Sequence, residues 1–183
     1  MGDDKHTRLV FLGFTDEMLA KTVLEVIKEG RRKKAITVED WVMVQKTADG
    51  ELKVTNDKGA DPGGARGAMV GGVAGWALAT LAGPIGLGAM IGGAAIGAIT
   101  AKVKDSGIKN DDVDTVTGFM VPGRTGLMLA IPLEEAGRWD AFVAENAEFH
   151  SAIRRHQMDI TPDHSFEQGI EDYRRQQEAK QGG

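Results

Sequence analysis

The chain has 183 residues, with 22 basic and 27 acidic side chains and a formal net charge of −5 at pH 7. This length fits one domain with room for an insertion, and the negative charge gives no reason to expect nucleic acid as a partner. The chain contains no Cys, which excludes disulfides and thiolate chemistry, and its 42% hydrophobic residues argue against wholesale disorder.

The chain begins with a predicted strand and helix. Residues 8–14 (RLVFLGF) form an apolar run of strand length, which indicates a buried strand. Thr15 is the expected N-cap of the next helix, because its side chain can accept a bond from a free backbone N–H. Gly30 is expected to close that helix. The basic run that follows, residues 31–34 (RRKK), is expected either to contact anionic lipid head groups or to be a solvated helix end.

Two strands joined by a tight turn are predicted next. The long strand predicted over residues 36–44 has apolar side chains in alternation at Ile36, Val38, Val42 and Val44. Asp49-Gly50 is a strong hairpin signal, and residues 52–54 begin the returning strand. With the first strand and helix, these elements make residues 8–58 the first β-α-β half of a domain.

The most unusual part of the chain is a charge-free segment, residues 67–101, in which ten residues are Gly and ten are Ala. Gly83-Pro84 divides it, and Pro cannot continue a helix from within. Residues 59–105 are therefore predicted to form a helical hairpin with its tip at Gly83-Pro84. Glycines on common helix faces, several at four-residue spacing, let helices pack closely. The residues expected to make these helix-packing and oligomer contacts are Gly67, Gly71, Gly75, Gly88, Gly92, Gly93 and Gly97.

Such helices need a stabilising environment, because each Gly costs roughly 1 kcal/mol relative to Ala. A bilayer would supply it, since unpaired backbone groups are costly in lipid, and a dry oligomeric core is the alternative. The two halves of 16 and 17 residues rise roughly 24–26 Å, against about 30 Å of hydrocarbon. Spanning, partial insertion and burial within an oligomer all stay open.

Basic residues lie at the open end of the predicted hairpin. Arg66 precedes it, and Lys102 and Lys104 follow it. In a membrane setting these side chains are expected to contact lipid head groups, and both flanking parts would then face the cytoplasm. The alternative is an ordinary solvated hairpin end.

After the hairpin, a helix, a strand, a second helix and an edge strand are predicted within residues 110–160. Pro122-Gly123 marks the turn before an uncharged strand. Apolar residues at helical spacing predict a helix over residues 133–146. The last strand is predicted over residues 149–160.

The chain ends in a predicted helix. Ser165 and Gln168 fit a capping box, so residues 163–183 are expected to form a C-terminal helix and tail. The order β-α-β, hairpin, β-α-β, helix predicts the α+β class. The expected architecture is a ferredoxin-like βαβ-βαβ sandwich with an inserted Gly/Ala-rich helical hairpin.

Residues that could carry chemistry are few. His150 and His156 would share a face of an extended strand, where His164 or Asp163 could join them around a metal; the alternative is that they are surface residues. The glycines at residues 61–64 lack the spacing of a phosphate-binding loop. No catalytic, cofactor-binding or metal-binding residue is therefore assigned, and the chain is not expected to be an enzyme.

Three features of the sequence point to a family. They are VMVQKTADGELKV at residues 42–54, the Gly/Ala hairpin, and VPGRTGLMLAI at residues 121–131. Together they resemble the bacterial "predicted membrane protein" domain-of-unknown-function family 1269, over roughly residues 9–160. The resemblance implies a ferredoxin-like domain tied to a membrane-associated hairpin, and it implies no catalytic residues. A more distant resemblance to general-stress proteins with a glycine-zipper hairpin implies a stress-related role.

The sequence thus predicts a non-enzymatic, membrane-associated protein that assembles with itself. Its expected partners are membrane lipids and further copies of the chain, it needs no cofactor, and its expected location is the cytoplasmic face of the inner membrane. The alternative is a soluble ligand-binding regulatory module whose hairpin is buried in an oligomer core, since ferredoxin-like sheets host many binding sites.

Overall fold

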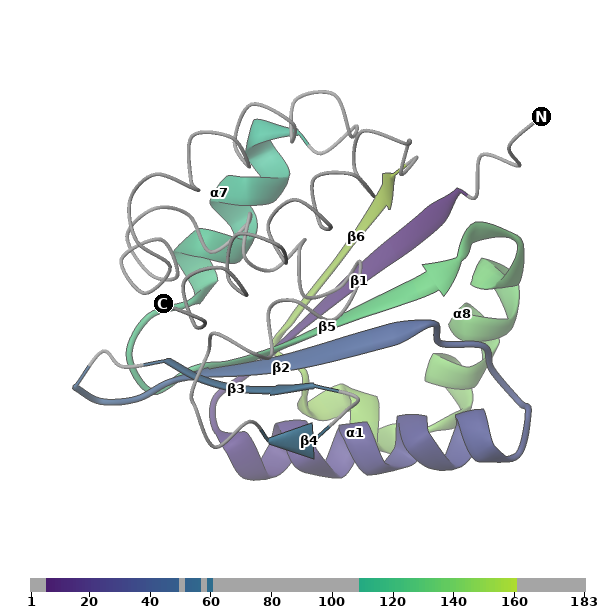
Figure 1. Ribbon diagram of the computed structural model, residues 1–183, viewed down its shortest axis with the longest axis horizontal. Coiled ribbons are helices and arrows are strands. Elements are labelled where there is room, and N and C mark those ends of the chain that lie inside the picture. The colour runs from purple at the N-terminus through teal and green to yellow at the C-terminus, as the bar shows by residue number, and fades with distance from the viewer. Residues whose placement is uncertain (1–5, 50–51, 57–58, 61–108, 161–183) are drawn as a thin grey trace, which may run out of the picture.

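A computed structural model of the chain describes residues 6–49, 52–56, 59–60 and 109–160. These residues form one antiparallel sheet with helices packed against it (Figure 1), in the strand order β4-β3-β2-β5-β1-β6. The strands are β1 (Thr7–Phe14), β2 (Asp40–Lys46), β3 (Leu52–Asn56), β4 (Gly59–Ala60), β5 (Thr125–Pro132) and β6 (Arg154–Ile160). The helices are α1 (Glu17–Arg32), α7 (Asn110–Phe119) and α8 (Ala136–Glu145), with short 3-10 helices η1 (Leu133–Glu135) and η2 (Ala147–Ser151). The prediction of a mixed α and β fold is confirmed.

The uncharged strand β5 lies inside the sheet, as its composition predicts. It pairs with β1 on one side and β2 on the other, so that Leu129 stands opposite both Val10 and Trp41. A strand buried on both faces has no solvated side for charged residues. Residues far apart in the sequence therefore meet here, since β2 and β5 flank the charge-free segment in the chain and are neighbours in the sheet.

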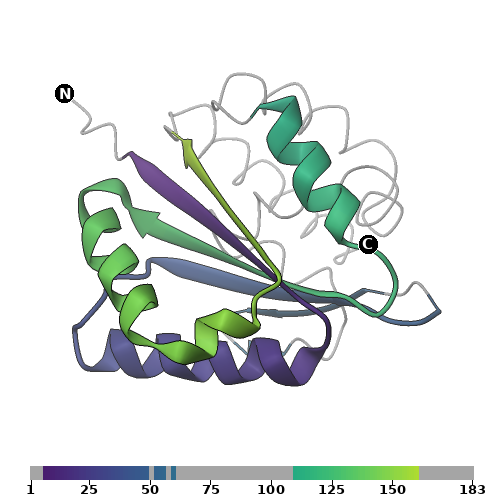
Figure 2. The same ribbon diagram turned by 180° about the vertical axis from the view of Figure 1, so that it is seen from behind.

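Helices α1 and α8 cover one face of the sheet (Figure 2). Their apolar stripes pack on the alternate side chains of the central strands, and Trp139 of α8 lies edge-on to Phe149 with ring centroids 5.6 Å apart. The resulting core cluster comprises Val10, Leu12, Phe14, Ala20, Val23, Leu24, Ile27, Ile36, Val38, Trp41, Met43, Leu127, Leu129, Ile131, Trp139, Phe149 and Ala152.

Helix α7 lies on the opposite face (Figure 1). This face is also apolar, and Leu9, Phe11 and Met128 on it are 0% exposed. Two glycines let α7 come close: a Cβ atom on Gly13 would lie 2.5 Å from the Phe119 ring, and one on Gly126 would lie 2.9 Å from the Met120 sulfur. The sheet is thus covered by helix on both faces, which explains why residues 9–14 of β1 and 126–131 of β5 are apolar.

Helix α1 differs from the prediction at both ends. Its N-cap is Asp16 rather than Thr15, and the Asp16 carboxylate accepts the Leu19 N–H at 3.1 Å. Gly30 does not close the helix, which runs on to Arg32; it is buried where a Cβ would meet the Phe142 ring at 2.6 Å. The left-handed residue after the helix is Lys34, at φ 58°.

The strand that was expected over residues 36–44 begins only at Asp40. Ile36 and Val38 are buried before it without belonging to a strand, so their alternation reflects burial in the core rather than sheet pairing. The β2–β3 hairpin predicted by Asp49-Gly50 is confirmed by the antiparallel pairing of the two strands.

The second half needs similar corrections. The helix predicted over residues 133–146 is split into the 3-10 turn η1 and the α-helix α8, and the strand predicted over residues 149–160 begins at Arg154. Phe149 and His150 belong to η2 instead, where Phe149 turns into the aromatic core.

Several predictions fall on other parts of the chain. The packing glycines, the tip at Gly83-Pro84, the basic residues Arg66, Lys102 and Lys104, and the C-terminal helix all lie outside the described residues. Residues 59–60, expected at the start of the hairpin, form β4 at the sheet edge. Among the described helices, none combines the length and the apolar character needed to cross a bilayer.

Candidate functional site

A clamped turn leads from α7 into β5. The Arg124 N–H donates to the Val121 carbonyl at 3.1 Å, and Gly123 has φ +86° with Pro122 before it, which is the pattern of a type II turn. The turn is fastened to β2 by two more backbone bonds, from Gly123 N–H to the Lys46 carbonyl (2.7 Å) and from Lys46 N–H to the Arg124 carbonyl (2.9 Å). Arg124 therefore stands at a well-defined point at the start of β5.

The ring of Phe119 lies between this turn and the sheet. One side of it fills the space above Gly13, and it meets Phe11 edge-on at 5.8 Å between centroids. The guanidinium carbon of Arg124 lies 5.5 Å from the Phe119 ring centre. This cation–π contact directs the Arg124 side chain toward the end of α7.

A second arginine reaches the same place from the edge strand. Arg154 begins β6 and pairs in register with Gly13, so its side chain leaves the sheet on the face that carries α7. Both arginines line a pocket of about 370 Å³ at the C-terminal half of α7. The lining residues are Asp114, Thr115, Gly118, Phe119, Val121, Arg124 and Arg154.

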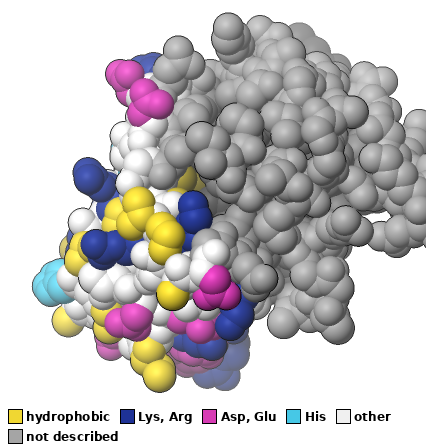
Figure 3. Space-filling view, turned by 90° about the vertical axis from the view of Figure 1, so that its left-hand side faces the viewer, with side chains coloured by type: hydrophobic (Ala, Val, Ile, Leu, Met, Phe, Trp, Pro, Cys, Tyr) yellow, Lys and Arg dark blue, Asp and Glu magenta, His cyan; other side chains and the backbone are white. Residues whose placement is uncertain are grey.

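The pocket is open at Gly118, where an added Cβ would meet nothing within 4 Å. Its charges are two guanidiniums and the Asp114 carboxylate. None of the three forms an ion pair within the part of the chain that the structure describes. Figure 3 shows the end of the molecule where α7 turns into β5, with hydrophobic side chains between basic ones. The pocket thus offers unneutralised positive charge beside an apolar wall.

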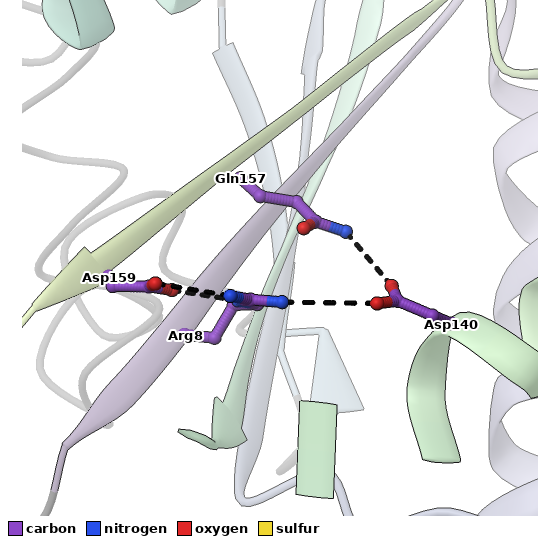
Figure 4. A network of polar contacts seen from close by, with 4 residues as sticks. All are labelled: Arg8, Asp140, Gln157 and Asp159. Atoms are coloured by element: carbon purple, nitrogen blue, oxygen red, sulfur yellow. Dashed lines mark hydrogen bonds and ion pairs between the residues drawn. The ribbon is translucent and has the colours of Figure 1, made fainter. Parts of the chain in front are cut away.

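A separate polar network joins β1, β6 and α8 (Figure 4). Arg8 contacts Asp159 at two points, with Nε–Oδ1 at 2.7 Å and Nη2–Oδ2 at 3.1 Å. Its Nη1 lies 4.0 Å from Asp140 Oδ2, and Gln157 Nε2 donates to the other Asp140 oxygen at 3.3 Å. The hydrogen bonds from Arg8 hold the pKa of the Asp159 carboxyl below its usual range, and the same contact raises the pKa of Arg8. The network contains two carboxylates and one guanidinium, and its side chains contact one another across the three elements, so we assign it to the fastening of β6 and α8.

His156 holds α7 to the sheet. Its Nε2 lies 2.7 Å from Asp112 Oδ1, while Asp112 Oδ2 accepts the Lys109 N–H at 2.9 Å. One carboxylate thereby caps the start of α7 and ties it to β6. The shared strand face expected for His150 and His156 is wrong, because His150 lies in η2.

The described residues contain no cluster of three metal-ligating side chains; Asp163 and His164 lie outside them. The basic run at residues 31–34 spans the end of α1, and Arg32 and Lys33 of this run form ion pairs with Glu29 of the same helix. Hydrogen bonds from Arg32 and then Lys33 lower the pKa of Glu29 to about 2.

The arginine pocket was not predicted from the sequence. The sequence predicts a turn at Pro122-Gly123, and it predicts no role for Arg154 beyond membership of an edge strand. The signal that does exist is the arginine directly after the turn, within VPGRTGLMLAI. Arg154 and Phe119 line the same pocket as Arg124 only because strands from distant parts of the chain pair in the sheet.

The comparisons with known proteins bear on residues 63–168, which match the family model described as protein of unknown function (DUF1269). The match spans the charge-free segment, α7, the Val121–Arg124 turn, β5, α8 and β6. No curated protein and no solved structure matches the chain. Because the family model covers more than half of its residues, the chain belongs to the DUF1269 family.

Proposed function

We propose that this protein is a non-enzymatic, self-assembling protein that associates with the cytoplasmic face of a membrane through residues 67–101. The observation that carries the proposal is an uncharged, Gly- and Ala-rich segment set into the chain between two strands that pair with each other. Strands β2 and β5 are hydrogen-bonded neighbours, with Val44 opposite Gly126, yet 35 uncharged residues lie between them in the sequence.

The fold that fits this arrangement is ferredoxin-like. Strands β6, β1, β5 and β2 follow one another in the sheet, and the chain runs β1-α1-β2 and then β5-α8-β6. Two split β-α-β units in that order are the ferredoxin-like pattern. On this proposal the charge-free segment is an insertion between the two units, free to serve a purpose other than completing the core.

The composition of the segment favours helices packed closely in lipid or against copies of themselves. Small faces made by Gly67, Gly71 and Gly75 allow backbone approach. The flanking cations Arg66, Lys102 and Lys104 suit the phosphate level of an anionic leaflet, at about 1 kcal/mol each near the surface. No residue from 67 to 101 carries a charge that would oppose burial.

Assembly through the sheet edge is less favourable. The edge strand β6 exposes Arg154, Arg155 and Asp159, and charged side chains on an edge oppose pairing with another strand. We therefore assign self-association to the glycine faces rather than to β6.

Vesicle flotation with the full chain tests the membrane part. The chain should float with vesicles of phosphatidylcholine and phosphatidylglycerol, and deletion of residues 67–101 should abolish flotation. The assembly part is tested by Gly71→Leu with Gly75→Leu, which should reduce the mass measured by light scattering. Gly137→Leu is the matched control, because a side chain there meets open space on α8.

The outcomes separate this proposal from the alternative. A multi-subunit particle that needs no detergent and does not float would show that the segment is buried between subunits, as in the soluble ligand-binding module. An unchanged mass after both Leu substitutions would contradict the assignment of assembly to the glycine faces.

A further inference from the structure

We propose that the pocket between α7 and the Val121–Arg124 turn binds a phosphate group through the guanidiniums of Arg124 and Arg154. The group is either free phosphate, alone or as a small ester, or the phosphate of a lipid head group. This site lies wholly within the described residues and does not depend on the function proposed for residues 67–101.

The two arginines are positioned but not neutralised. Arg124 is placed by the clamped turn and by its 5.5 Å contact with Phe119, and Arg154 is placed by its register with Gly13 on β1. Neither has a carboxylate partner within 4.0 Å among the described residues. Elsewhere on the described surface Arg8, Arg32 and Arg138 each form an ion pair with an acid, whereas the two pocket arginines form none among the described residues, which leaves their charge available to a ligand.

Phosphate is the anion that matches this geometry. A guanidinium presents parallel N–H donors that fit phosphate oxygens in a two-point contact, and two guanidiniums can neutralise a doubly charged phosphate. The pocket volume of about 370 Å³ lies in the range of roughly 300–1,000 Å³ typical of small-molecule sites. The exposed Val121 and the Phe119 edge provide an apolar wall for the organic part of an ester.

Two other polar side chains line the pocket, and their contacts and charge lead to a further prediction about phosphate binding. The Thr115 hydroxyl already donates to the Asp111 carbonyl at 2.7 Å, so it offers no proton to the ligand. The Asp114 carboxylate repels a phosphate, so removal of its charge should strengthen binding.

Titration calorimetry of the full chain with inorganic phosphate, against chloride at equal ionic strength, measures the free-ligand arm. Arg124→Gln and Arg154→Gln should each weaken binding about tenfold or more, the loss expected for a charge-assisted hydrogen bond. Asp114→Asn should tighten binding about threefold or more, since a like charge is removed from the pocket.

Two further variants test whether phosphate binds in the pocket rather than elsewhere on the charged surface. Gly118 lines the pocket, and a Cβ atom there would meet nothing within 4 Å; Gly118→Leu should therefore block phosphate while keeping or raising the melting temperature. Lys53→Gln is the charge-matched control, because Lys53 is an exposed cation on β3; it should leave affinity unchanged.

The lipid arm uses flotation with phosphatidylcholine vesicles with and without phosphatidic acid. A loss of binding to the acidic vesicles in Arg124→Gln and Gly118→Leu, without calorimetric binding of free phosphate, assigns the site to lipid head groups. Calorimetric binding with the expected variant pattern assigns it to a free phosphate or ester.

The proposal is overturned if neither probe binds, or if Lys53→Gln weakens binding as much as the arginine variants. It is also overturned if Gly118→Leu leaves binding intact. Because the calorimetric arm needs no membrane, a failure of the proposed membrane association would not affect it.

Discussion

The ring of Phe119 fills the space above Gly13: a Cβ atom on Gly13 would lie 2.5 Å from two of its carbons. This contact brings the end of α7 onto β1, where Phe119 lines the same pocket as Arg124 and Arg154. The shape of the arginine pocket thus depends on a residue that has no side chain.

Substitution of Gly13 by Ala should therefore displace Phe119. We expect the free energy of unfolding to fall by about 1–3 kcal/mol, the usual cost of overpacking, measured by urea denaturation. In a Phe119→Ala background the same substitution should cost much less, since the clashing ring is gone. Gly137→Ala, which meets nothing within 4 Å, is the control and should not destabilise. An equal loss from Gly13→Ala in both backgrounds would show that the ring is not what Gly13 accommodates.

Asp112 and His156 should contribute unequally to the hold on α7. His156→Ala removes one contact and should cost about 0.5–1.5 kcal/mol. Asp112→Ala removes that contact and also the acceptor for the Lys109 N–H, so it should cost more, about 1–2 kcal/mol. Amide hydrogen exchange of α7 is the measurement, with exposed His150→Ala as the control. Faster exchange after His150→Ala than after His156→Ala would contradict the assignment.

The Arg8–Asp159 pair should make stability depend on acid pH. The pKa of Asp159 is lowered from 3.8 in the folded protein by hydrogen bonds from Arg8. Its contribution is therefore fully present above the unfolded pKa and is lost as pH falls through the lower folded value. Asp159→Asn should lower the free energy of unfolding at neutral pH by less than about 1 kcal/mol, because the side chain is half exposed.

The difference in the free energy of unfolding between wild type and Asp159→Asn should become smaller as pH falls below 3.8, and it should vanish in stronger acid. Urea denaturation over a series of pH values measures it. In an Arg8→Gln background the Asp159 substitution should have little effect at any pH. A difference that persists unchanged in that background would assign the pH dependence to another group.

Thr125 should tolerate the loss of its hydroxyl. The residue is 0% exposed, and its Oγ1 has no hydrogen-bond partner among the described residues. A buried hydroxyl without a partner costs about 1–3 kcal/mol, and Val has a similar shape and a higher β-strand propensity. Thr125→Val should therefore keep or raise the melting temperature. Thr7→Val, at the other end of the sheet, is the control that tests whether such a gain is specific to the position of Thr125. A clear destabilisation by Thr125→Val would mean that the hydroxyl is satisfied, for example by a buried water.

The elements predicted best were those encoded by local signals. The apolar run of β1, the Asp49-Gly50 hairpin and the uncharged β5 follow from composition and turn chemistry over a few residues. The predictions were wrong where a residue buried for packing produced the same sequence pattern as a strand or a helix end. Ile36 and Val38 alternate as in a strand, yet they fill the core ahead of β2, and Gly30 marks a close helix contact with Phe142 rather than a helix end.

By itself, the sequence determined the mixed α and β character of the chain, its family, and the charge-free segment at residues 67–101, because these are properties of composition and short-range order. Only the tertiary structure decided that Arg124, Phe119 and Arg154 share a pocket. Arg154 reaches it because β6 pairs with β1 in one register, and Phe119 reaches it because Gly13 leaves room on that face. Strand register and close packing between segments more than 100 residues apart have no signature in either segment alone.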